Sequence, residues 1–177
     1  MMLDATENYE APLTRDRLFG WQAALFPGGY SDLRPVRTGA WRDDAAGPMQ
    51  VVSGREGKWR VHFEAPPAAR VGAEVDRFIE WFNRRNEPEG LLRAGLAHLW
   101  FETIHPFEDG NGRVGRAIAD QALAQSEGSP QRFYSLASQL QKERSDYYDR
   151  LERAERGSMD VTDWLVWFLS CLSRAIE

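Results

Sequence analysis

Apolar residues recur at intervals of three and four along most of the chain, the spacing that places them on one face of a helix. The first 27 residues are predicted to be helical in two pieces, with Thr14 as an N-cap and Pro27 ending the second piece. Pro66 and Pro67 begin another helix, and two more helices lie near the C-terminus. The four apolar stripes are Leu18, Trp21, Leu25 and Phe26; Val71, Val75, Phe78, Ile79 and Phe82; Leu136, Leu140, Tyr147 and Leu151; and Val161, Trp164, Leu165, Phe168, Leu172 and Ile176.

The segment from Leu91 to Ile104 is apolar at nearly every position, which predicts a buried central helix rather than an amphipathic one. It runs directly into His105 and Pro106. Proline disfavours helix at the residue before it, so the central helix should end at His105. Another helix follows and is broken by residues 126–130. These patterns together predict a mainly α fold, with six to seven helices around a buried central helix.

Residues 28–67 differ from the rest because they are rich in glycine and proline. Two runs within them are typical of strands, Met49 to Ser53 and Trp59 to Phe63. Gly54 and Gly57 between the runs favour a turn, so we predict one β-hairpin. An isolated hairpin is only marginally stable, and this one should therefore rest on the helical body.

The composition of the 177-residue chain is that of one globular domain: 42% of the residues are hydrophobic and 28% are charged. The net charge of −5 argues against a nucleic-acid-binding domain that relies on phosphate neutralisation. The single cysteine, Cys171, lies in an apolar run and is predicted to be buried; it cannot form an internal disulfide. No signal peptide is visible, and the longest apolar run, Val161 to Leu172, is too short to span a bilayer. We therefore expect a cytoplasmic protein with no membrane partner.

The candidate chemistry lies in residues 105–116, with the sequence HPFEDGNGRVGR. Glycines at 110 and 112 tolerate positive φ and allow successive backbone N–H groups to converge on an anion. The turn feeds into the N-terminus of a helix, where free N–H groups also favour an anion. Arg113 and Arg116 lie three residues apart and project from one face of the first turn. This arrangement predicts a binding site for a di- or triphosphate.

Three further side chains of this segment complete the prediction. Asp109 beside a polyphosphate is the natural ligand for Mg²⁺, which binds through one or two carboxylates plus phosphate oxygens. His105 is the group that could act as a general base near neutral pH. Phe107 is apolar within a polar loop and should anchor the loop to the core. Together they describe nucleotidyl or phosphoryl transfer.

This segment resembles the Fic family signature, H-x-F-x-(D/E)-G-N-G-R-x-x-R, at all of its specified positions. The resemblance extends from about Leu13 to Glu177, because the family also places a hairpin and a buried helix before the histidine. It implies the Fic fold and a protein adenylyltransferase that transfers AMP from ATP to a Tyr, Thr or Ser hydroxyl of a target protein, releasing pyrophosphate. In that reaction His105 would deprotonate the hydroxyl.

The resemblance also implies roles for the remaining site residues. Asp109 would hold Mg²⁺, the turn Gly110, Asn111, Gly112 with Arg113 would bind the α- and β-phosphates, and Arg116 would reach the γ-phosphate. The hairpin would be the family's flap, where Val51, Val52 and Ser53 hold the target by strand addition. Tyr147 and Tyr148 fall where family members place a nucleotide-pocket pair.

Several of these residues also have a second interpretation. Residues 110–115 also fit G-x-G-x-x-G, but a dinucleotide fold needs a strand before them and a helix is predicted there. His98, Glu102 and His105 have metal-ligand spacing, although a core histidine and a supporting glutamate are favoured. His62 is interpreted as a surface strand residue. The alternative functions are an ATP-binding regulatory or toxin-type module, or a Fic variant that transfers phosphate or removes AMP.

The domain organisation follows from the resemblance: a single Fic domain over 1–177, with a partial N-terminal helix in 1–12, the flap region in 28–67 and the helical catalytic core in 68–177. Many Fic enzymes are inhibited by a segment with the motif (S/T)-x-x-x-E-(G/N), and the chain does not contain it. We therefore expect a fragment of a longer protein. The partners implied are a target protein, an inhibitory segment or antitoxin, and a second copy in a homodimer.

Overall fold

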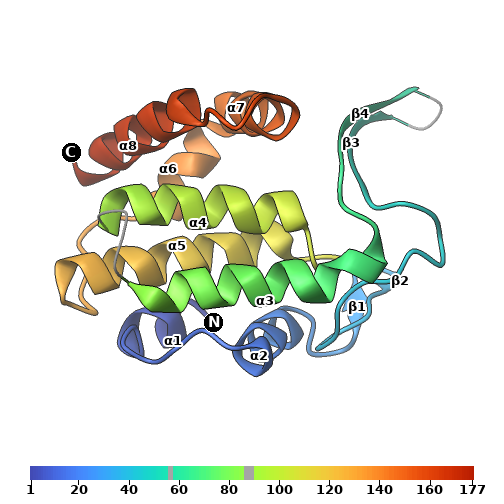
Figure 1. Cartoon of the computed structure of the whole chain (residues 1–177), viewed down its shortest axis with the longest axis horizontal. Coiled ribbons are helices and arrows are strands. Elements are labelled where there is room, and N and C mark those ends of the chain that lie inside the picture. Colours follow the sequence, from blue (N-terminus) through green and yellow to red (C-terminus); the bar gives the residue numbers. More distant parts are fainter. Residues whose placement is uncertain (56–57, 86–89) are drawn as a thin grey trace.

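The computed structural model describes residues 1–55, 58–85 and 90–177, and over these residues the chain is mostly helical (Figure 1). Two short antiparallel hairpins accompany the helices. The elements in chain order are α1 (Met2–Glu7), α2 (Arg15–Leu25), β1 (Tyr30–Ser31), β2 (Arg34–Pro35), β3 (Gln50–Arg55), β4 (Lys58–Glu64), α3 (Ala68–Arg84), α4 (Gly90–Ile104), α5 (Asn111–Glu127), α6 (Leu136–Lys142), α7 (Arg144–Arg156) and α8 (Thr162–Ile176).

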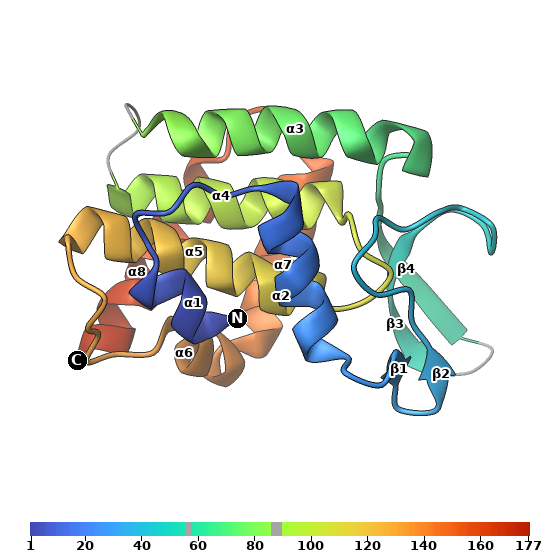
Figure 2. The same ribbon diagram turned by 90° about the horizontal axis from the view of Figure 1, so that it is seen from below.

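The helices α4 and α5 run side by side through the middle of the molecule, and the other helices surround them (Figures 1 and 2). Helices α3, α1 and α2 cover one side, whereas α6, α7 and α8 cover the other. The central position of α4 confirms the prediction from its largely apolar sequence.

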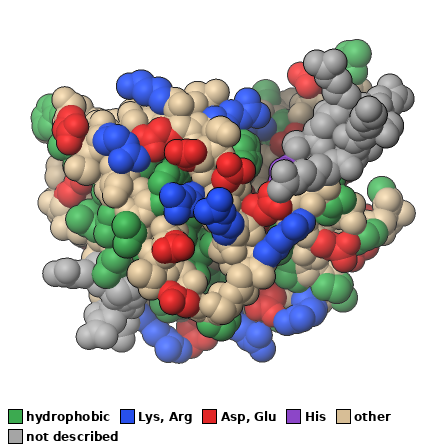
Figure 3. All heavy atoms as spheres, turned by 90° about the horizontal axis from the view of Figure 1, so that it is seen from above, with side chains coloured by type: hydrophobic (Ala, Val, Ile, Leu, Met, Phe, Trp, Pro, Cys, Tyr) green, Lys and Arg blue, Asp and Glu red, His purple; other side chains and the backbone are tan. Residues whose placement is uncertain are grey.

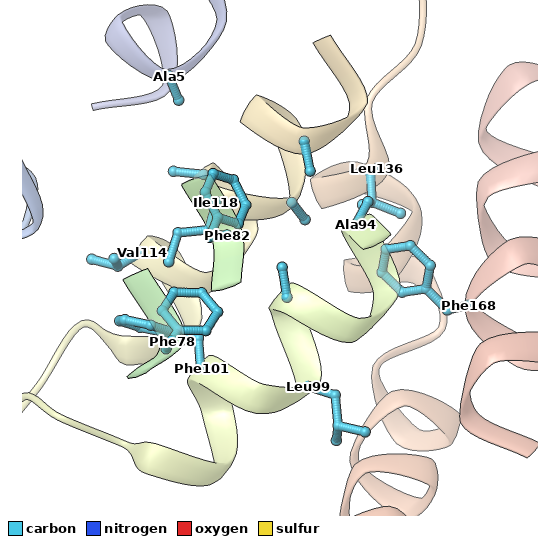
Figure 4. Packing of buried hydrophobic residues seen from close by; sticks show 14 of the residues in the cluster. Ala5, Phe78, Phe82, Ala94, Leu99, Phe101, Val114, Ile118, Leu136 and Phe168 are labelled. Carbon is cyan, nitrogen blue, oxygen red and sulfur yellow. The ribbon is translucent and has the colours of Figure 1, made fainter. Parts of the chain in front are cut away.

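The core consists of large apolar side chains that meet around α4. In Figure 4, Phe78, Phe101 and Val114 gather near one another, and Phe168 of α8 approaches Ala94 from the opposite side. All five side chains are fully buried. Burying an aromatic side chain of this size contributes about 1.5–3 kcal/mol, so this core supplies much of the driving force that holds α3, α4, α5 and α8 together. The predicted burial of Cys171 is confirmed.

The predicted start of α2 and end of α4 are both observed. The Thr14 side chain accepts a hydrogen bond from Arg17 N at 3.1 Å and caps α2. Helix α4 ends at Ile104, and His105 adopts a left-handed conformation with φ of +49°. Pro106 disfavours the helical conformation at His105, which turns the chain sharply at this point.

The predicted hairpin is β3–β4, which projects from the helical body (Figure 1). Its strands extend closer to the turn than Met49–Ser53 and Trp59–Phe63, with Val51 opposite Phe63 and a bulge between Val51 and Val52. His62 lies in β4, as predicted, and is partly exposed: its side chain is 19% exposed and contacts Glu152 of α7. This contact joins the hairpin to the helical body.

The described residues contain eight helices rather than six to seven. The stripe from Leu136 to Leu151 forms two helices, α6 and α7, which meet at Glu143. The Glu143 carboxylate accepts hydrogen bonds from Arg174 of α8 at 2.6 and 2.7 Å, and this long-range contact accompanies the break. The β1–β2 hairpin was not predicted either, because its strands are only two residues long. No helix within the described ranges is long and apolar enough to cross a membrane.

Candidate active site

A cavity of about 890 Å³ lies where α4 ends and α5 begins, beneath the β3–β4 hairpin. Four parts of the chain line it: residues between Arg34 and Val52, which include the start of β3; Glu102 of α4; the segment 105–116; and α7. Basic and acidic side chains are interspersed on the face of the molecule shown in Figure 3. An anion-binding site in this cavity must therefore depend on a few basic side chains that lie close together. The overall net charge of −5 indicates the same.

His105 faces this cavity with a defined tautomer. Its Nδ1–H donates to the carbonyl oxygen of Glu102 at 3.2 Å, which leaves the lone pair on Nε2. Burial lowers the pKa of His105 to about 4; the Glu102 carbonyl and Asp109 oppose this shift, and the charge of Arg42 adds to it. The imidazole is therefore neutral at pH 7 and able to accept a proton.

Two residues within the turn after His105, Asn111 and Phe107, hold it together. The Asn111 side chain accepts a hydrogen bond from Phe107 N at 2.9 Å and donates one to Phe107 O at 2.8 Å. The Phe107 ring is fully buried against Trp41 and Phe101, which confirms it as the anchor of the loop. Asn111 also lines the cavity, and its predicted contact with the nucleotide stays a prediction.

Gly110 precedes the first residue of α5 and has a φ of +92°. A Cβ at this position would lie 3.0 Å from Leu25 and 3.1 Å from Phe26, so only glycine fits without strain. Because Gly110 has no side chain to cap α5, the first N–H groups of the helix are available to an anion. Gly112 does not adopt positive φ; it lies within the first turn of α5.

Arg113 and Arg116 both line the cavity, as their spacing predicted. The Arg113 guanidinium lies 4.7 Å from the centre of the Phe26 ring and 3.7 Å from Asp109 Oδ1. For Arg116, no carboxylate of the described residues lies within 4.0 Å. A cavity lined by a cation that lacks a carboxylate partner among the described residues favours an anionic ligand.

Asp109, the predicted magnesium ligand, lines the cavity. Its side chain is 31% exposed, and Oδ1 accepts a hydrogen bond from Gly110 N at 2.6 Å. The other oxygen remains for a cation that is also bound by phosphate oxygens. The described part of the chain holds no group of three or more metal-binding side chains, and a site completed by phosphates does not require one.

His98 and Glu102 lie on α4, and His105 follows directly after its last residue, Ile104. His98 is fully buried, its Nε2 lies 2.9 Å from Tyr147 Oη, and burial lowers its pKa to about 4. Burial raises the pKa of Glu102 to about 7, and nearby Arg116 opposes this shift. One oxygen of Glu102 lies 3.9 Å from His105 Nδ1. The burial of His98 and its contact with Tyr147 agree with the prediction that it is a core histidine.

Helix α7 forms the far wall of the cavity. Tyr147 is buried and Tyr148 is 43% exposed, and both line the cavity together with Leu151 and Glu155. Burial raises the pKa of Glu155 to about 8, and the charges of Glu102 and Glu152 raise it further. The structure therefore brings the tyrosine pair and residues 105–116 to one cavity, although more than thirty residues separate them in sequence.

Strand β3 forms the near wall. Val51 and Val52 line the cavity, and β3 pairs with β4 along one edge; the described residues place no strand along its other edge. Ser53 lies in the same strand opposite Arg60, and its side chain is outside the described residues. An unpaired strand edge can bind an extended peptide.

Sequence reasoning missed two residues that position the catalytic turn. The buried Arg42 donates from Nε to His105 O at 2.8 Å. Gln22, also buried, donates to Asp109 O at 3.4 Å and accepts from Gly39 N at 2.9 Å. Their partners are backbone groups up to 87 residues away, and no local pattern could indicate them.

Comparisons with known proteins identify the family. The Fic/DOC family model matches residues 12–123. A protein adenylyltransferase Fic from Nematostella vectensis is 29% identical over 136 residues, covering 75% of this chain and 30% of that protein. A uridine 5′-monophosphate transferase from Xanthomonas campestris pv. campestris is 29% identical over 130 residues, covering 68% of this chain and 22% of that protein.

The solved structure of a Fic family protein from Desulfovibrio desulfuricans G20 superimposes with a TM-score of 0.74 and 26% identity, covering 99% of this chain and 49% of that one. The chain thus spans less than half the length of each of these proteins. The family match covers more than half of the chain and includes the loop whose geometry is described above. The chain belongs to the Fic/DOC family.

Proposed function

We propose that this chain transfers AMP from ATP to the hydroxyl of a Tyr, Thr or Ser side chain in a target protein. The observation that carries the proposal is the shared cavity of residues 105–116, strand β3 and helix α7. A base, an anion-binding helix start and an unpaired strand edge meet there. The relative from Nematostella vectensis, named a protein adenylyltransferase, supports the same reaction.

His105 acts as the general base in this proposal. Its Nε2 takes the proton from the target hydroxyl while that oxygen attacks the α-phosphorus of ATP. A bond forms between the hydroxyl oxygen and the α-phosphorus, and the bond from that phosphorus to the bridging oxygen breaks, releasing pyrophosphate. The neutral imidazole, with Nδ1–H fixed on the Glu102 carbonyl, is the form that can accept the proton.

The start of α5 binds the triphosphate. The first N–H groups of α5 and Arg113 face the α- and β-phosphates, and Arg116 reaches the γ-phosphate. Asp109 would hold Mg²⁺ through its carboxylate. When bound, the Mg²⁺ neutralises charge that develops on the leaving pyrophosphate.

The walls of the cavity select the two substrates. Val51, Val52 and Ser53 of β3 bind the target segment by strand addition, so that its hydroxyl enters beside His105. Tyr147 and Tyr148 contact the nucleotide from α7. The relative named a uridine 5′-monophosphate transferase makes UMP transfer a second candidate, because it matches 68% of this chain.

Three labelled nucleotides test the proposal. The chain is incubated with Mg²⁺, a lysate, and α-³²P-ATP, γ-³²P-ATP or α-³²P-UTP, beside a His105→Ala variant. Label from α-³²P-ATP that depends on His105 supports AMP transfer. Label from γ-³²P-ATP indicates phosphate transfer, and label from α-³²P-UTP alone indicates UMP transfer. ATP binding without any label supports the regulatory-module alternative.

The remaining expectations stay predictions. They are a single Fic domain over 1–177, a reducing cytoplasm inferred from the one cysteine, an inhibitory segment or antitoxin as a partner, and a homodimer. Removal of AMP from a modified target is tested with the same His105→Ala pair, by following loss of label.

A further inference from the structure

Arg42 is a buried arginine in the segment that leads into the β3–β4 hairpin. Its side chain is 1% exposed, although arginine is seldom buried without a function for its charge. The charged partner within the described residues is Asp44, at 3.0 Å. The other hydrogen bonds of this guanidinium go to the backbone carbonyls of His105 and Pro66.

The hydrogen bonds of Arg42 join three separate parts of the chain. Nε donates to His105 O at 2.8 Å, and the backbone N of Arg42 donates to Pro106 O at 2.9 Å. Nη2 donates to Pro66 O, at the point where the chain leaves the hairpin for α3. Asp44, which leads into the hairpin, also accepts from Ala68 N at 2.7 Å at the start of α3.

The segments that flank the hairpin and the turn after His105 are therefore bound to the same guanidinium. Asp44 lies in the segment that leads into β3, and Pro66 lies in the segment that follows β4. The Arg42 side chain contacts both residues. The same side chain holds the carbonyl of His105, the residue with φ of +49°. A left-handed conformation is costly for a residue with a Cβ, and a buried hydrogen bond to its carbonyl helps to maintain it.

We propose that Arg42 is a positioning residue that sets the distance and orientation between a target peptide on β3 and the imidazole of His105. The proposal rests on the proposed transfer reaction. In that reaction the acceptor hydroxyl is placed by β3 and the base is placed by the turn at His105. A displacement of about 1 Å between the two groups can reduce the rate about 100-fold, so a rigid link between them is of direct value.

The position of Arg42 separates this role from nucleotide binding. The phosphates are bound by the start of α5, with Arg113 and Arg116, and Arg42 does not line the cavity. Loss of Arg42 should therefore reduce the turnover of bound substrates while ATP affinity changes little. A residue that merely stabilised the fold would lower both quantities together.

The test compares Arg42→Gln, Arg42→Lys and the control Arg70→Gln, which removes an exposed arginine paired with Glu74 on α3. Hydrogen exchange is followed in the segments 45–52 and 103–108, ATP affinity is measured by calorimetry, and transfer is measured at saturating ATP. The ¹⁵N signals of His105 report the charged groups around it, which are Arg42, Asp109 and Glu102. Arg42→Lys keeps the charge but cannot make the same three hydrogen bonds.

For Arg42→Gln we expect faster exchange in both segments together, an ATP affinity within about twofold of the wild type, and transfer reduced about 100-fold. Arg42→Lys should show the same loosening and a smaller loss of transfer, with the pKa of His105 closer to that of the wild type. Arg70→Gln should match the wild type throughout.

Loosening of one segment alone, wild-type transfer by Arg42→Gln, or equal losses of ATP affinity and transfer would each overturn the proposal. If the wild type transfers nothing, the proposed function fails. Hydrogen exchange then still decides whether Arg42 couples the hairpin to the catalytic turn.

Discussion

Asn111 and Phe107 form a reciprocal pair of hydrogen bonds that closes the catalytic turn, with Phe107 N to Asn111 Oδ1 at 2.9 Å and Asn111 Nδ2 to Phe107 O at 2.8 Å. The amide of asparagine is suited to this pair because it both donates and accepts. Asn83 makes the same pair with the backbone of Leu13, at 2.9 and 2.8 Å, and does not line the cavity.

These two asparagines give a matched test of the turn. Replacing Asn111 by Ala should cost about 1–3 kcal/mol of stability, because buried backbone groups of Phe107 lose their partner. It should also abolish ATP binding, since the first turn of α5 is no longer held. Asn83→Ala should lose comparable stability and keep ATP affinity. Urea denaturation and calorimetry give both quantities; equal ATP affinity in the two variants would contradict the prediction.

Gly115 should not tolerate a methyl group, although it lies in a helix. A Cβ there would lie 2.6 Å from Glu102 Oε1 and 3.3 Å from His98 Nδ1, both of which are buried. We expect Gly115→Ala to destabilise the fold by about 1–3 kcal/mol and to displace Glu102. Gly20, in α2, has no atom within 4 Å of its Cβ position. Gly20→Ala should therefore be neutral or stabilising by about 0.5–1 kcal/mol in the same denaturation experiment.

His105 should titrate near pH 4 when followed by NMR, below the ordinary value of 6.5, because burial disfavours the imidazolium. The unfolded chain then binds more protons than the native one between pH 6.5 and 4. The stability contributed by neutral His105 is thus present above pH 6.5 and is lost as the pH falls towards 4.

Relative to His105→Gln, the wild type should lose up to about 3 kcal/mol over this range. A midpoint for His105 at or above 6.5 would show that the imidazole is not buried as described. The raised pKa values of Glu102 and Glu155 act in the opposite direction, and the variant pair removes their contribution from the comparison.

Arg113 and Arg116 should differ in the phosphate that they sense. We expect Arg116→Ala to weaken ATP binding by about 10–100-fold and to change ADP binding little, because its predicted contact is the γ-phosphate. Arg113→Ala should weaken both nucleotides. Calorimetric titration of each variant with ATP and ADP measures the difference. If Arg116→Ala weakened ADP as much as ATP, its assignment to the γ-phosphate would be wrong.

The predictions that succeeded from sequence depend on local interactions. Thr14 caps α2, Pro106 ends α4, and most residues of the apolar run from Leu91 to Ile104 are buried, although Leu91 is 44% exposed. Each of these follows from backbone geometry or side-chain burial within a few residues. The sequence likewise placed Arg113 and Arg116 on one face, since their spacing of three is a property of the helix itself.

Tertiary structure decided the features that depend on distant partners. The break at Glu143 accompanies its contact with Arg174 of α8, and the partial burial of His62 accompanies its contact with Glu152 of α7. Arg42 and Gln22 hold the turn after His105 through hydrogen bonds to its backbone carbonyls. Because every residue has a backbone carbonyl, such contacts produce no recognisable pattern in the sequence. Residue types and helical spacing by themselves determined the candidate chemistry of the loop. Only the folded chain could place α7, strand β3 and Arg42 around it, because those contacts form between segments far apart in sequence.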